Sequence, residues 1–261
     1  MEITGYSASI LIGVSLGLIG GGGSILTLPV LVYLFTVDTV LATTYSLFIV
    51  GATSLAGAVS YFRKGLIDVQ VAVFFGLPSI AAVFLTRHYL LPAIPERVSA
   101  FGGSPVSKPA LLMVLFAVLM LTAAYSMIKG ESKTEPSERS GNLTLVVLQG
   151  TAVGLVTGLI GAGGGFLIIP ALVNFLKLPV KAAIGTSLLI IAVNSLAGFG
   201  FSLGEGKIEW NFLLTVTAIA IIGVFFGTYL STKINGKKLK PAFGWFVLAM
   251  GIYILIKETI H

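Results

Sequence analysis

The chain has 261 residues, a net charge of +6 and a mean hydropathy of +1.03, with 56% hydrophobic but only 10% charged residues. Soluble domains carry about 25% charged residues, so this composition excludes an ordinary soluble domain and indicates a protein embedded in a lipid bilayer. Cysteine is absent, which excludes disulfides and thiolate metal sites, and the basic residues lie between apolar runs, where they orient a membrane protein rather than bind nucleic acid.

Stretches without charged residues mark the predicted membrane segments. A spanning helix needs about 20 apolar residues. Most of the stretches have about that length, whereas 3–37 and 142–176 have 35 residues each and are too long for one ordinary span. The other stretches are 39–62, 69–86, 109–128, 182–204, 210–232 and 241–256. The sequence therefore predicts an all-α integral membrane protein whose surface contacts membrane lipid.

An internal repeat organises the chain. Residues 13–70 align without a gap to residues 154–211, at an offset of 141 positions, and 21 of 58 positions are identical. The alignment keeps glycine, proline and serine in register, which apolar composition alone does not explain. We expect a first repeat at 1–128, a polar linker at 129–141 and a second repeat at 142–261.

Each 35-residue run is interrupted by glycines, GGGG at 20–23 and GAGGG at 161–165. One continuous helix of that length would extend about 52 Å, against an apolar bilayer core of about 30 Å. Glycine is unfavourable inside helices and readily adopts positive φ, so we expect the helix to break there. Each run then either crosses the membrane as two half-helices or turns back as a re-entrant hairpin.

Loop charges favour the hairpin. With hairpins, the second repeat is inverted, and one side of the membrane collects 11 Lys and Arg residues against 5 on the other; with crossing runs the division is 9 to 7. Cytoplasmic loops carry the excess of Lys and Arg. We therefore expect two inverted repeats, each a glycine-broken re-entrant helical hairpin plus three transmembrane helices, with the linker in the cytoplasm and both termini outside it.

The glycine turns form the predicted substrate site. Hairpin arms of about 14–17 residues would extend about 21–25 Å, so turns that enter from opposite faces could meet in mid-membrane. Helices that begin near Ser24 and Gly165 would present unpaired backbone N–H groups and the positive end of the helix dipole, which favour an anion. The predicted binding residues of the turns are Gly20, Gly21, Gly22, Gly23, Ser24, Gly161, Gly163, Gly164 and Gly165.

The next helix of each repeat adds polar side chains to this predicted site. Ser46 and Thr53 share one helical face, and Ser187 and Asn194 are their counterparts. Thr186 adds a further hydroxyl. Such spacing also marks close helix packing in membranes, which is the role we expect for Ser54, Gly57, Ser195 and Gly198.

Charged residues near the ends of the apolar stretches are expected to be structural. Asp68 and Glu209 match across the repeat, and an acidic residue in the first turn of a helix ordinarily stabilises it. Arg87 and His88 lie at the end of a predicted span, where a long side chain usually reaches the membrane interface.

No Asp, Glu, Lys, Arg or His lies inside the apolar stretches, so an acid-based proton relay, an acid–base pair or a metal-ligand cluster has no candidate there. A nucleotide-binding phosphate loop is also absent. We expect no enzymatic activity, no metal and no cofactor. The leading interpretation is a secondary transporter of a small anion with alternating access. An anion channel with the same donors and a non-transporting membrane scaffold are the alternatives.

At these residues the chain resembles the sulfite exporter TauE/SafE family of membrane transporters. The resemblance covers nearly the whole chain and is carried by GLIGGGGSILTLP at 17–29, GLIGAGGGFLIIP at 158–170, GTSL at 185–188 and the helix starts at 65–68 and 206–209. The first repeat departs from it, with TYSL at 44–47.

The resemblance implies a multi-pass permease of the bacterial inner membrane. Its substrates would be sulfur-containing anions such as sulfite, sulfoacetate or other organosulfonates, and members are usually described as exporters. The identity of the anion, the direction of transport, the coupling ion and a homodimeric state are left open.

Overall fold

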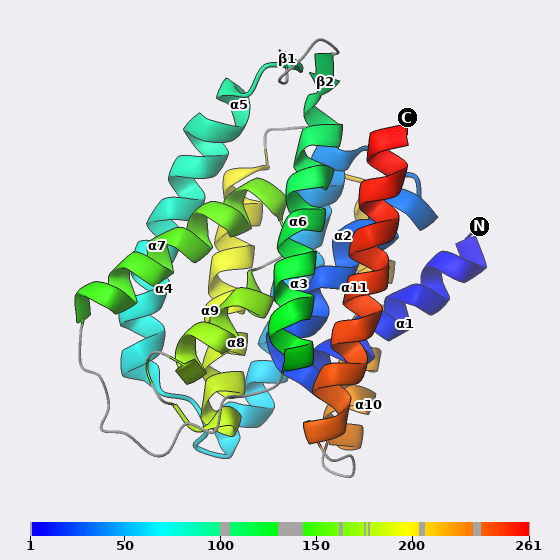
Figure 1. Ribbon diagram of the computed structural model, residues 1–261. Coiled ribbons are helices and arrows are strands. Elements are labelled where there is room, and N and C mark those ends of the chain that lie inside the picture. The colour runs from blue at the N-terminus through cyan, green and yellow to red at the C-terminus, as the bar shows by residue number, and fades with distance from the viewer. Residues whose placement is uncertain are drawn as a thin grey trace.

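The computed structural model describes residues 2–99, 105–129, 143–161, 164–174, 176, 178–203, 207–231 and 236–260, and these are almost entirely helical (Figure 1). The longer helices are α1 (Glu2–Ile19), α3 (Thr39–Arg63), α4 (Val69–Leu85), α6 (Lys108–Lys129), α7 (Leu143–Ile160), α8 (Gly165–Asn174), α9 (Val180–Phe201), α10 (Trp210–Ser231) and α11 (Gly236–Ile260). The short helices are the 3₁₀-helix η1 (Gly20–Leu26), α2 (Thr27–Pro29), the π-helices η2 (Val30–Leu34) and η3 (Thr86–Leu90), and α5 (Leu91–Ala93). A small antiparallel ribbon pairs β1 (Arg97–Ser99) with β2 (Pro105–Ser107).

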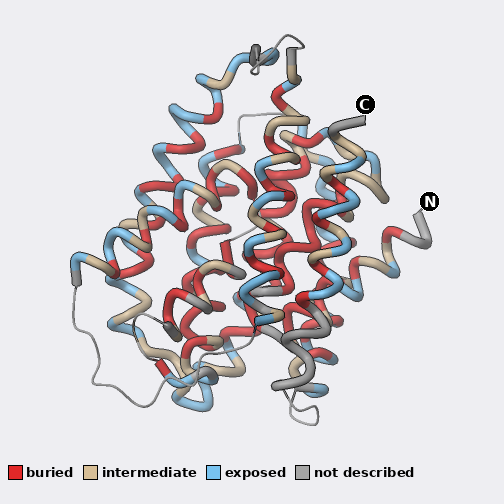
Figure 2. The backbone as a smooth tube through the Cα atoms, viewed as in Figure 1, coloured by how far each residue is buried: buried red, intermediate tan, exposed pale blue. Residues whose placement is uncertain are grey.

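Five helical segments among the described residues are long and apolar enough to cross a membrane. They are Thr39–Arg63, Val69–Ala93, Lys108–Ser126, Lys181–Phe201 and Trp210–Leu230. Shorter apolar helices cover Gly5–Leu18, Gly23–Leu34 and Thr144–Ile160. Large apolar side chains such as Leu77 of α4 and Phe226 of α10 are exposed, which suits contact with lipid. Figure 2 shows buried residues concentrated in the centre of the bundle and exposed residues along its outer helices.

The centre of the molecule is formed by α3 and α9. In each, 67% of the most apolar window is buried, against 33–39% for the other three candidate spans. The two helices run antiparallel: Leu188 near the start of α9 packs on Gly57 near the end of α3, and Leu47 near the start of α3 packs on Gly198 near the end of α9. Gly57 and Gly198 therefore take the packing role expected for them.

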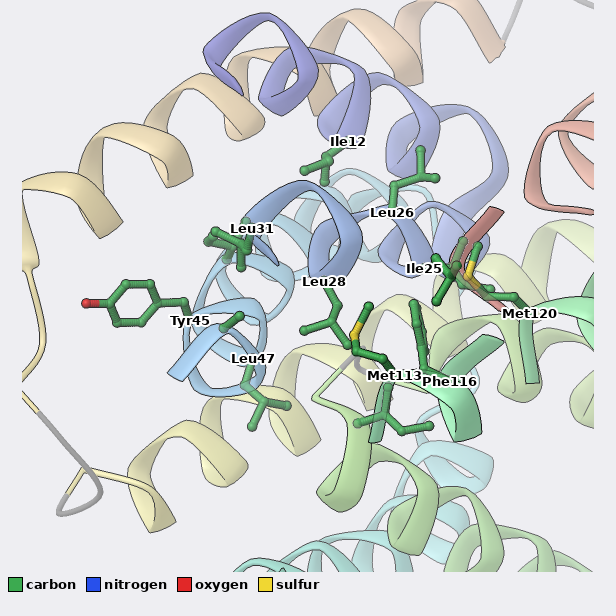
Figure 3. Packing of buried hydrophobic residues seen from close by; sticks show 14 of the residues in the cluster. Ile12, Ile25, Leu26, Leu28, Leu31, Tyr45, Leu47, Met113, Phe116 and Met120 are labelled. Atoms are coloured by element: carbon green, nitrogen blue, oxygen red, sulfur yellow. The ribbon is translucent and has the colours of Figure 1, made fainter. Parts of the chain in front are cut away.

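The first 35-residue run folds back on itself. The ring of Phe35, which follows η2, packs against Gly5 and lies 5.5 Å from the ring of Tyr6. The beginning and the end of the run are thus neighbours, which a continuous crossing helix would not allow. Figure 3 shows how apolar side chains of this run, among them Ile25 and Leu28, pack near Phe116 of α6 in one buried cluster.

Contacts between the two halves occur in pairs related by the 141-residue offset. Helix α1 packs against α10, and α7 packs against α4. Glycines allow close approach at both places, since Gly13 lies against the backbone of Ala220 and Gly154 lies against the backbone of Ser79. The same offset converts each of these contacts into the other.

Two hydrogen bonds between the halves are also related by the 141-residue offset. The backbone N–H of Asp68 donates to the Thr186 hydroxyl at 2.9 Å, and the backbone N–H of Glu209 donates to the Tyr45 hydroxyl at 2.8 Å. Each bond connects the start of α4 or α10 to the central helix of the opposite half. The Asp68 carboxylate also accepts from the Val71 N–H at 3.1 Å and so caps α4, the structural role that its position predicts.

Candidate functional site

Both glycine segments form tight turns after a helix. Gly20 ends α1 with φ +71°, and Gly161 ends α7 with φ +73°, a region that only glycine adopts without strain. After each turn the chain runs back along the preceding helix. The Cα of Leu16 would lie 2.5 Å from a Cβ atom on Gly23, and Gly164 lies against the hydroxyl of Thr157.

The two turns contact each other. A Cβ atom on Gly21 would lie 2.7 Å from the Cα of Gly165, and one on Gly165 would lie 2.5 Å from the carbonyl oxygen of Gly21. The Cδ1 atom of Ile191, on α9, would lie 2.5 Å from either Cβ atom. Both glycines are buried, so the turns meet inside the molecule against the central helix.

The helix after the first turn differs from the prediction. An α-helix was expected to begin near Ser24, but residues Gly20–Leu26 form the 3₁₀-helix η1, followed by α2 and a π-helical turn. The Ser24 hydroxyl donates to the carbonyl of Gly21 at 2.8 Å, within the same turn. Glycine-rich backbone and Pro29, which has no N–H to donate, prevent a regular α-helical ladder here.

In the second half, α8 begins at Gly165 as the sequence predicts. Its first amides are therefore placed at the contact between the turns. Gly163, also predicted to bind substrate, lies outside the described residues, as does most of the linker at 129–141.

All five of the predicted side chains on α3 and α9 are buried. Ser187 and Asn194 lie one turn either side of Ile191, on the face of α9 that packs against the turns. The Ser187 hydroxyl donates to Ile184, and the Asn194 amide donates to the Ser79 hydroxyl at 2.6 Å. The Asn194 carbonyl oxygen has no hydrogen-bond partner among the described residues.

On α3, Ser46 lies one turn beyond Thr43, whose carbonyl oxygen contacts Gly161. The Ser46 hydroxyl is fully buried and, within the described ranges, has no hydrogen-bond partner. The Thr53 hydroxyl instead donates to the carbonyl of Ile49 at 2.6 Å, within its own helix. Thr186 is the exception among the predicted residues, because its hydroxyl binds the Asp68 amide at the start of α4 rather than facing a turn.

A buried arginine beside the second turn was not predicted as part of the site. The sequence places Arg87 at a membrane interface, but its side chain is only 1% exposed. Its guanidinium donates to the hydroxyls of Thr43 at 3.1 Å and Thr44 at 3.4 Å. The neighbouring Thr86 packs on Gly158 of α7.

Arg87 is buried because the helix that contains it is longer than the sequence predicts. The span that the sequence ends at residue 86 continues through η3 and α5, so the segment Val69–Ala93 is helical and Arg87 lies inside it. Helix α7 then covers η3. The only sequence signal for this arrangement was the threonine pair at 43–44 in the first repeat, which has no hydroxyl counterpart at 184–185.

The sequence pattern of the sulfite exporter TauE/SafE family matches residues 6–254. The chain belongs to this family. A "Probable membrane transporter protein" of Xylella fastidiosa is 30% identical over 252 residues, which cover 94% of this chain and 91% of the relative. Bacillus subtilis YdhB, at 27% identity, and a Methanocaldococcus jannaschii protein, at 24%, carry the same description and cover 85% and 94% of this chain and 86% and 92% of themselves.

Membership of this family, together with the apolar helices, makes the chain a multi-pass, all-α membrane protein of transporter type. The family and the descriptions of its relatives indicate a transporter rather than an enzyme. The contacting glycine turns and the buried polar side chains around them are therefore the candidate site for the transported substrate.

Proposed function

We propose that this chain is a secondary transporter of small sulfur-containing anions, such as sulfite, sulfoacetate or other organosulfonates, and that it acts as an exporter in the bacterial inner membrane. The observation that carries the proposal is the contact of Gly21 with Gly165 between the two halves. Broken helices that meet between repeats are a common location of substrate sites in secondary transporters.

The chemistry of the turns supports an anion. In the first turn of α8 the Leu167 and Ile168 amides donate to the Gly164 carbonyl, which leaves the amides of Gly165 and Phe166 as the donors for a substrate, and the helix dipole adds partial positive charge. In this structure Gly21 and Ile191 pack against Gly165; once the two turns separate, glycine places no side chain over these donors, and an oxyanion can approach the backbone closely. Ser46 and Asn194, which have polar atoms without partners among the described residues, would complete the shell of ligands together with Ser187 and Thr53.

We further propose that the two halves are inverted in the membrane and that each contributes a re-entrant hairpin. The paired contacts under the 141-residue offset support a two-fold relation between the halves. Because α3 and α9 are equivalent under this relation yet run antiparallel, an axis that exchanges them must lie across the helices, in the plane of the membrane. Rocking of one half against the other would then expose the site to each side in turn.

An anion channel would use the same backbone donors but would conduct without a closed intermediate. The burial of Gly21 and Gly165 beneath Ile191 favours the transporter, since the described residues there hold the turns in close contact. A scaffold without transport activity would require no backbone donors at the contact. Single-channel currents in planar bilayers would favour the channel.

Purified protein in detergent should be tested in a thermal-shift screen against sulfite, sulfate, thiosulfate, sulfoacetate, taurine and acetate. A ligand at 100 times its Kd stabilises the folded state by about 2.7 kcal/mol, so a sulfur-containing anion should raise the Tm measurably while acetate does not. Transport of the ligand that stabilises the protein most should then saturate with concentration in proteoliposomes. The same ligand inside the proteoliposomes should drive counterflow. Absence of both stabilisation and flux for every sulfur-containing anion would refute the proposal.

A further inference from the structure

A cluster of polar side chains that includes a cation lies at the second glycine turn. Thr43, Thr44, Thr86 and Arg87, here called the Arg87 cluster, lie beside the second turn: the carbonyl of Thr43 contacts Gly161, and Thr86 packs on Gly158 one turn earlier. Under the 141-residue offset their counterparts at the first turn are Ile184, Gly185, Gly227 and Thr228. The first turn thus has no equivalent guanidinium, although the corresponding residue pairs, Gly20 with Ile184 and Gly17 with Gly227, are also in contact.

Burial of the Arg87 charge costs free energy. Its guanidinium stays protonated at any physiological pH, and a charge inside a membrane span costs several kcal/mol or more unless polar groups compensate it. Arg87 is 1% exposed, within a helical segment whose other residues are mostly apolar. Such residues usually serve ion or substrate pathways in membrane proteins.

An anion can displace the threonine hydroxyls that bind the Arg87 guanidinium. Two of its hydrogen bonds go to neutral hydroxyls, and the Thr44 contact is long at 3.4 Å. A buried guanidinium attracts an anion by a Coulomb interaction that a neutral hydroxyl lacks, and its planar fork can bind two oxygens of one group. A sulfite or sulfonate oxygen would therefore compete successfully with a threonine hydroxyl.

The threonines divide into two roles. The Thr43 hydroxyl already donates to the Val40 carbonyl at 2.7 Å, so toward Arg87 it can act only as an acceptor that positions the guanidinium. The Thr86 hydroxyl is fully buried and has no hydrogen-bond partner in the described part of the chain. The Thr86 hydroxyl can therefore donate a hydrogen bond to a ligand. It is adjacent to Arg87 in sequence and packs against Gly158 of α7.

We propose that the Arg87 cluster is the charge-recognising subsite of the transporter. Arg87 and Thr86 bind the negatively charged sulfite or sulfonate group, Thr43 positions the guanidinium, and the second glycine turn closes the subsite. The inference rests on the proposed function. The subsite takes its cation from the first repeat and its backbone wall from the second, so movement of one half against the other assembles and separates it.

Three variants test the subsite: Arg87→Gln, Arg87→Lys and, as a matched control, Arg97→Gln, whose arginine is exposed at the start of β1. Sulfite and sulfoacetate dissociation constants should be measured by calorimetry in detergent, and flux in proteoliposomes. Loss of hydrogen bonds to a charged group predicts about a 10- to 100-fold weaker affinity for Arg87→Gln, partial recovery in Arg87→Lys and no change in Arg97→Gln.

The outcomes separate the two proposals. If the wild-type protein neither binds nor transports these anions, the proposed function fails. If the wild-type protein does both and a folded Arg87→Gln variant retains its affinity and flux, the function stands and the subsite is wrong. Should Arg87→Gln not fold, Thr86→Val provides the second test, because it removes the unpartnered hydroxyl without exposing a charge. An unchanged sulfite affinity in Thr86→Val would then overturn the assignment.

Discussion

Gly165 occupies a position where the backbone of the opposite turn leaves no space for a side chain. A methyl group there would lie 2.5 Å from the Gly21 carbonyl oxygen and 2.5 Å from Ile191 Cδ1. The flexible end of Ile191 can move aside, but the backbone of the first turn cannot move without opening the contact between the halves. The requirement for glycine is therefore steric at this position and conformational at Gly20 and Gly161, where φ is positive.

At the residue scale we predict that Gly165→Ala reduces anion flux at least tenfold and lowers the free energy of unfolding by about 1–3 kcal/mol, the usual cost of overpacking. Gly76→Ala is the matched control, because a Cβ atom on Gly76 of α4 meets nothing within 4 Å. It should leave flux unchanged and stabilise the helix by about 0.5–1 kcal/mol. Flux is measured in proteoliposomes and stability by thermal unfolding. Equal flux in the two variants would contradict a role in transport for the contact between Gly21 and Gly165.

At the scale of helices, the repeat predicts which elements correspond, and the structure shows what connects them. The starts of α4 and α10 are each tied to the central helix of the opposite half by one backbone N–H, through Thr186 and Tyr45 respectively. Different side chains therefore make the same connection in the two halves. Local sequence could not predict this role for Thr186, because its partner at residue 68 is 118 positions away.

This connection predicts a structural effect for Thr186→Val and Tyr45→Phe. Each change removes the acceptor of one amide and should lower the free energy of unfolding by about 0.5–1.5 kcal/mol. Sulfite affinity should stay within about twofold of wild type in both, measured by calorimetry beside thermal unfolding. A weaker affinity in Thr186→Val with no loss of stability would instead return Thr186 to the substrate site, as the sequence predicted.

At the scale of the whole molecule, the direction of the helices places different segments at opposite ends of the bundle. In Figure 1 the C-terminal end of α11 and the β1–β2 ribbon lie toward one end, and the start of α4 lies at the other. The charge distribution predicts that the end with the start of α4 faces the cytoplasm and that the other end faces outward.

The natural chain has no cysteine, so single cysteines can report topology without background. We predict that Ser137→Cys, in the linker, reacts with a membrane-impermeant maleimide only when the cytoplasmic face is opened. Glu96→Cys, in the exposed segment before β1, should react in intact cells. Labelling of both cysteines from the same side would exclude the inverted arrangement proposed here.

Hydropathy, the glycine interruptions and the 141-residue repeat predicted an all-α membrane protein with helix breaks at 20–23 and 161–165, because these properties are local or periodic along the chain. The family was indicated by the resemblance of motifs such as those at 17–29 and 158–170. The burial of Arg87 depended on tertiary structure. An arginine after an apolar stretch ordinarily reaches water, and only the packing of α7 on η3, with Gly158 against Thr86, encloses it. Burial of a charge depends on segments distant in sequence, which no local pattern records.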